Sequence, residues 1–166
     1  MGVLMVDIET AAKNLIEVFQ RQSKMTHSGI VISSAAILDL QLERALKTAM
    51  RPLSKKIYER LFESFGLLSS FASKIVMAYA LGIITKEIYD ELEKIRHIRN
   101  EFSHSSKLLD FESKEIAPKF LALKKPQTTK GGPSEIFLQC VTVIDVFLDA
   151  YLLRMGETQE KEKGPA

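Results

Sequence analysis

The sequence R-N-x-x-x-H, formed by Arg99, Asn100 and His104, combines side chains that could act on a phosphodiester. A guanidinium offers a planar fork of hydrogen-bond donors that suits a phosphate. A histidine can transfer a proton near neutral pH. Together they suit metal-free cleavage of RNA. The histidine would move a proton at the ribose 2′-hydroxyl or the leaving oxygen, and the arginine would stabilise the phosphorane.

Two further polar residues, Arg96 and Ser103, fall within the same two helical turns and are predicted to support the site. One histidine cannot easily serve as both acid and base. We therefore expect a homodimer in which two copies of the site face each other across the symmetry axis.

A structural role for the same residues is the competing interpretation. Arg99 lies four residues after Ile95, so it should point into or beside a buried stripe and would need a partner there. Asp39 and Glu43, one turn apart on an earlier helix, could pair with Arg99 or orient His104. A short motif also arises by chance, and His104 could simply favour the negative end of its helix.

The elements that would position these residues are all predicted to be helices. Apolar residues recur at helical spacing and we find no strand alternation of useful length. We expect an all-α bundle of about five to six helices with short connections. Residues 1–156 should form one domain, and residues 157–166 a polar, disordered tail. The predicted helices run from Ile8 to Phe19, about Ser28 to Ala49, Ser54 to a positive-φ stop at Gly66, Ser69 or Ser70 to Gly82, Thr85 to about Ser103, and Pro133 or Ser134 to Gly156. Ser69 or Ser70 and Thr85 are the expected caps of the fourth and fifth of these. A looser, basic stretch is expected from Ser105 to Gly132.

Composition excludes several classes of protein. The 166 residues are 46% apolar and 27% charged, with a formal charge of +2, which is too balanced for a protein that coats nucleic acid by charge. The single Cys140 excludes a disulfide framework and a cysteine zinc site, and we predict no metal or cofactor. Gln139, Asp145 and Asp149 interrupt the most apolar stretch, so we expect no membrane span and a cytoplasmic location.

The central part of the chain is similar to a known family. The run LFESFGLLSSFASKIVMAYALGIITKEIYDELEKIRHIRNEFSHS, followed by DFESKEI, resembles the mannitol operon repressor family, MtlR. That family shows Gly-Pro-Leu, a Lys- or Arg-containing helix, Tyr-x-Leu-Gly, an acidic helix and Arg-x4-His. The resemblance covers about Leu61 to Ile116, and Leu67 stands where the family often has proline. The motif from Arg99 to His104 also resembles the signature of the HEPN superfamily.

The two resemblances imply different functions. HEPN enzymes are dimeric, metal-independent endoribonucleases, often toxins or defence effectors, and their motif would make Arg99 and His104 the catalytic pair with Asn100 in support. The leading hypothesis is therefore a HEPN-like bundle that cuts RNA as a toxin, defence or RNA-processing effector.

The mannitol family instead implies repression of a sugar-alcohol operon. Because the chain shows no helix-turn-helix or basic recognition helix, direct DNA binding is not expected. The alternative is thus a non-catalytic transcriptional regulator acting through a protein partner. A third interpretation is an antitoxin-like subunit.

Overall fold

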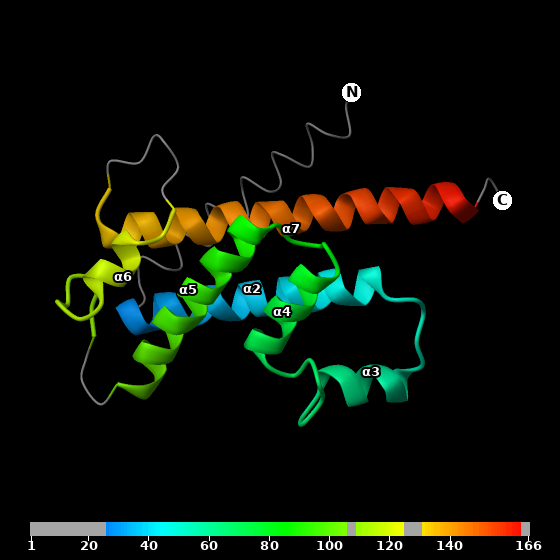
Figure 1. The fold of residues 1–166 in the computed structure, drawn as a ribbon, viewed down its shortest axis with the longest axis horizontal. Helices are drawn as coiled ribbons and strands as arrows, with labels where there is room; N and C mark the ends of the chain where they lie inside the picture. The colour runs from blue at the N-terminus through cyan, green and yellow to red at the C-terminus, as the bar shows by residue number, and fades with distance from the viewer. Residues whose placement is uncertain (1–25, 106–108, 125–130, 164–166) are drawn as a thin grey trace.

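The computed structural model describes residues 26–105, 109–124 and 131–163, with α-helices as the regular elements of these ranges (Figure 1). The all-α prediction is confirmed. The helix predicted from Ile8 to Phe19 lies outside the described residues. The helices are α2 (His27–Ala49), α3 (Lys55–Phe62), α4 (Phe71–Ala80), α5 (Lys86–His104), α6 (Ala117–Leu121) and α7 (Pro133–Lys163).

Local sequence rules account for where three of these helices begin. The side-chain oxygens of Thr26, Ser70 and Thr85 each accept a hydrogen bond from the backbone N–H three residues later. Such caps satisfy donors that the first helical turn leaves free. Thr85 was the predicted cap of α5, and Ser70 was one of the two predicted caps of α4, beside Ser69. Gly82, with φ of 69°, follows the end of α4 as predicted.

The core lies around α2, which packs against α7, α5 and α4 (Figure 1). The apolar stripe of α5 that contains Ile95 is buried from Leu92 to Phe102, and Ile88 is partly buried. Burial of these stripes supplies the main hydrophobic stabilisation of the bundle. The fully buried large side chains are Phe111, Phe120, Phe137, Leu38, Leu42, Leu46, Ile75, Leu92, Ile95, Ile98, Ile116 and Ile136.

The turn after α3 differs from the prediction. The positive φ falls on Ser64, at 50°, and not on Gly66. Gly66 is needed for space instead, since a Cβ there would lie 2.4 Å from the carbonyl oxygen of Leu61. Phe65, next to Gly66 in this turn, points fully into solvent.

The stretch predicted to be loose, Ser105 to Gly132, contributes to the core where it is described. It contains α6 and an aromatic cluster that joins α6 to α7. The ring centroids of Phe111 and Phe120 are 4.7 Å apart, and those of Phe120 and Phe137 are 5.3 Å apart. The prediction was wrong because these anchors follow no regular period and are recognised only through their tertiary contacts.

The last helix, α7, continues past Gly156 to Lys163. From Pro133 to Gly156 it is long and apolar enough to cross a membrane by length and composition, contrary to our expectation for this stretch. Its inner face nevertheless packs on α2 within the bundle. Asp145 and Asp149, which interrupt the apolar run, both accept hydrogen bonds from Nε2 of Gln41 on α2, at 3.0 and 2.7 Å.

Candidate functional site

The R-N-x-x-x-H motif occupies the exposed C-terminal end of α5. Arg99, Ser103 and His104 are exposed and Asn100 is half-buried. Nη1 of Arg99 donates to Oδ1 of Asn100 over 3.1 Å. Arg99 thus lies beside the buried stripe and not within it, and its exposed guanidinium does not need a buried partner. Its position lies at the edge of that stripe, and a long arginine side chain can reach solvent from there.

Arg96, a predicted supporting residue, is engaged within its own helix. Its Nε donates to Oε1 of Glu93 over 3.1 Å, and its Nη2 donates to Oε2 over 2.8 Å. This two-pronged hydrogen bond raises the pKa of Arg96. The guanidinium fork that could have held a phosphate is therefore already occupied by a carboxylate.

Asp39 and Glu43, proposed as partners of Arg99 or His104, bind Lys74 of α4. Nζ of Lys74 lies 3.1 Å from Oδ1 of Asp39 and 2.8 Å from Oε2 of Glu43. The Lys74 side chain is only 4% exposed. The two acidic residues thus form an ion-pair network between α2 and α4 and do not support the motif on α5.

The network also sets the protonation of Glu43. Burial alone would raise its pKa, but hydrogen bonds from Lys47 and Lys74 lower the pKa below its ordinary value. Glu43 is therefore ionised at neutral pH, as an ion pair with Lys74 requires.

Sequence reasoning missed Lys74, although a signal was present. The buried stripe of α4 includes Ile75 and Ala78, and Lys74 falls one turn before Ala78 on the same face. A lysine within such a stripe requires a carboxylate partner. Asp39 and Glu43, spaced one turn apart on α2, are the matching pair.

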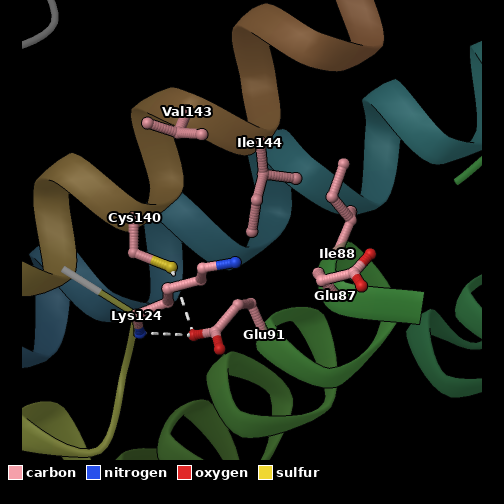
Figure 2. A pocket seen from close by; sticks show the side chains of 7 residues that line it. All are labelled: Glu87, Ile88, Glu91, Lys124, Cys140, Val143 and Ile144. Atoms are coloured by element: carbon pink, nitrogen blue, oxygen red, sulfur yellow. Dashed lines mark hydrogen bonds between the residues drawn. The ribbon is translucent and has the colours of Figure 1, made fainter. Parts of the chain in front are cut away.

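The buried acid Glu91 lines a cleft of about 270 Å³ between α5, α7 and the segment after α6 (Figure 2). Oε2 of Glu91 accepts from the backbone N–H of Lys124 over 2.9 Å and from Sγ of Cys140 over 3.6 Å, as Figure 2 shows. Its Oε1 accepts from Nζ of Lys94 over 2.7 Å. The rest of the wall is mainly apolar, from Ile88, Val143 and Ile144.

The protonation state of Cys140 limits the chemistry that this cleft can perform. Burial raises the pKa of the Cys140 thiol to about 12, and the charge of Glu91 adds to the effect. The thiol stays protonated at neutral pH and is a poor nucleophile. In the described part of the chain, no group of three or more His, Cys, Asp or Glu residues is arranged to hold a metal ion.

Comparison with known proteins decides the family. The family model described as "Mannitol repressor", MtlR, matches residues 12–136. The chain belongs to the mannitol repressor family. The match extends beyond the segment on which the resemblance was based, toward both ends of the chain. No curated protein matches this sequence significantly.

A chain of the X-ray structure of the MtlR–HPr complex from Escherichia coli has a similar fold, with a TM-score of 0.58. The two chains are 19% identical, and the match covers 85% of this chain and 97% of the other. At this identity the likeness shows the fold. Membership in the mannitol repressor family supports the regulatory alternative better than the ribonuclease hypothesis.

Proposed function

We propose that this protein is a non-catalytic regulator of a sugar-alcohol operon that acts through a protein partner. The observation that carries the proposal is the match of residues 12–136 to the mannitol repressor family. The similar structure is a complex with a second protein, HPr, which makes an HPr the first partner to test. For a regulator of this kind we expect a cytoplasmic location.

The geometry around α5 supports a role without catalysis. Arg96 is held by Glu93, and Asp39 and Glu43 are held by Lys74. The predicted site is thereby reduced to four residues at the end of α5: the exposed Arg99, Ser103 and His104 and the partly exposed Asn100. An exposed site of this kind lacks the preorganised, water-excluding surroundings on which electrostatic catalysis depends.

The regulator proposal predicts that binding and regulation survive removal of the motif. We expect the purified protein to bind the HPr of its own cell, measured by calorimetry. Deletion of its gene should raise expression from a sugar-alcohol operon reporter. The folded double variant Arg99→Ala/His104→Ala should bind and repress like the wild type. Loss of repression in that variant, or a wild type that neither binds HPr nor affects the reporter, would contradict the proposal.

A second candidate is the HEPN-type ribonuclease, and one observation favours it. Asn100 orients the Arg99 guanidinium while His104 is open to a polymeric substrate at the same helix end. A homodimer would have to bring two such ends together around RNA. Wild type and His104→Ala should then differ in cleaving RNA in EDTA, with 2′,3′-cyclic phosphate ends as the product. Equal behaviour without such ends would exclude this candidate.

A further inference from the structure

Two large apolar side chains stand in solvent on the turn between α3 and α4. Relative to a fully open residue, Phe65 is 104% exposed and Leu67 is 80% exposed. Neighbouring Ile57 on α3 is 45% exposed. Single exposed apolar residues are ordinary, but a contiguous apolar patch on a protein surface marks an interaction site.

The turn that carries these side chains is held by hydrogen bonds. The N–H of Gly66 donates to the carbonyl of Glu63 over 2.8 Å, and the N–H of Leu68 donates to the carbonyl of Leu61 over 2.7 Å. Oγ of Ser69 donates to the carbonyl of Gly66 over 2.8 Å. Phe65 and Leu67 therefore project from a preorganised backbone, which lowers the entropy cost of binding through them.

The same turn borders a hollow of about 770 Å³ whose other wall is α3. Figure 1 shows α3 standing outside the bundle formed by α2, α4, α5 and α7. We call this region the α3–turn surface and define it by Ile57, Phe65, Leu67, Lys56 and Arg60.

The charges around the α3–turn surface are three cations and two acids, of which one cation and one acid form a pair. Lys55, Lys56 and Arg60 are exposed on α3. Glu59 is close to Lys55, with Nζ and Oε1 3.7 Å apart, and Glu63 is the other acid of the rim. Apart from the pair of Lys55 and Glu59, two cations (Lys56 and Arg60) stand against one acid (Glu63). A second copy docking face to face would therefore bring together more cations than acids, which disfavours it. A partner that carries carboxylates would be attracted.

We propose that the α3–turn surface docks a partner protein whose own face combines an apolar pocket with surrounding carboxylates. Phe65 and Leu67 fill the pocket, and Lys56 and Arg60 meet the carboxylates. The inference rests on the proposed function in requiring a protein partner, and it adds where that partner binds and by what chemistry. Aromatic anchors seated in pockets commonly dominate the affinity of such interfaces.

The test is photo-cross-linking in the cell from a benzoylphenylalanine placed at Phe65. The matched control carries the same group at Leu153, an exposed apolar residue of α7 (57% exposed). We expect one protein to be captured from position 65 and not from 153, and mass spectrometry then identifies it. The proposal would be overturned by equal capture at both positions, by no capture at position 65, or by an adduct of the chain with itself. It would also be overturned if the wild type binds anionic lipid vesicles and Phe65→Ser abolishes that binding.

The identified protein, once purified, is then used in calorimetry. Phe65→Ser/Leu67→Ser should weaken its binding at least about tenfold, as loss of interface anchors does, while Leu153→Ser should not. Lys56→Glu/Arg60→Glu should weaken binding and reduce its dependence on salt. All variants replace exposed side chains, and circular dichroism checks that they fold. Unchanged affinity in both double variants would overturn the proposal.

The docking surface and the proposed function can fail separately. If HPr binds and the reporter responds but position 65 captures nothing, the docking surface is wrong and the regulator proposal stands. If position 65 specifically captures a partner whose removal leaves the sugar-alcohol operon unchanged, the surface stands and the regulator proposal is wrong.

Discussion

At the scale of single residues, the surroundings of Lys74 restrict substitution strongly. Its ammonium is buried and pairs with both Asp39 and Glu43 on α2. Removing this cation takes the ion-pair partner from Asp39 and leaves Glu43 with Lys47 alone, and the loss exceeds the value of an exposed ion pair. The two acids are still partly exposed, at 32% and 22%, so water offsets part of the loss.

We therefore expect Lys74→Met to lower the free energy of unfolding by about 3 kcal/mol. Chemical denaturation followed by circular dichroism measures the change. The matched control is Lys47→Met, because Lys47 pairs with the same Glu43 but is 41% exposed. The control should lose less than about 1 kcal/mol. Equal losses in the two variants would contradict a special role for the buried lysine.

The same network predicts a dependence of stability on pH. The folded protein lowers the pKa of Glu43 below the ordinary value of 4.5. The ionised side chain therefore contributes stability above that ordinary pKa, and the contribution is lost as the pH falls through the folded pKa. The difference in unfolding free energy between the wild type and Glu43→Gln should be constant near neutral pH and shrink in acid. Urea titrations at several pH values measure this difference. If it grows as the pH falls, the pKa of Glu43 is not lowered by folding.

Single residues were also where sequence reasoning failed most. It placed the cation that needs a partner at Arg99, because the arginine falls at the edge of the α5 stripe. The structure places that cation at Lys74, within the α4 stripe. Helical periodicity gives the face of a residue, but which of two long cationic side chains reaches solvent depends on the neighbouring helix.

At the scale of elements, the beginnings of α4 and α5 could be predicted because caps are local. Ser70 and Thr85 each bond to a backbone N–H three residues away. The turn after α3 could not be predicted in the same way. Glycine is needed at position 66 because the backbone there passes close to the carbonyl of Leu61. Such a close contact depends on the path of the folded chain and not on the local sequence.

Gly66→Ala should consequently destabilise the protein although Gly66 lacks a positive φ. The added Cβ would lie 2.4 Å from the Leu61 carbonyl oxygen, a backbone atom that cannot move aside by rotating. We expect a loss on the order of 2 kcal/mol, as for other overpacked sites, measured by thermal and urea unfolding. A variant as stable as the wild type would show that the turn adapts.

Gly156→Ala should have the opposite effect. Gly156 lies within α7, and a Cβ there meets nothing within 4 Å. Alanine has a higher helix propensity than glycine, so stability should rise by up to about 1 kcal/mol. A loss of stability would indicate that the helix ends at Gly156, as the sequence had suggested.

At the scale of the whole molecule, an aromatic cluster joins helices that are distant in the chain. Phe120 on α6 contacts Phe102 on α5 and Phe137 on α7, with centroid distances of 6.1 and 5.3 Å. Phe111 lies 4.7 Å from Phe120. Composition and periodicity could predict the bundle, but they could not predict that an irregular segment closes one end of its core.

Removing the centre of this cluster tests whether that segment is part of the cooperative fold. Phe120 is fully buried, so Phe120→Ala should cost about 3–5 kcal/mol and lower the unfolding midpoint of the whole protein. Leu121→Ala is the matched control because Leu121 is on the same helix but 50% exposed, and it should change stability by less than about 1 kcal/mol. If only the segment from Phe111 to Leu123 loses hydrogen-exchange protection while the midpoint is unchanged, the segment unfolds independently of the bundle. A lowered midpoint in one transition shows that α5, α6 and α7 fold as a unit.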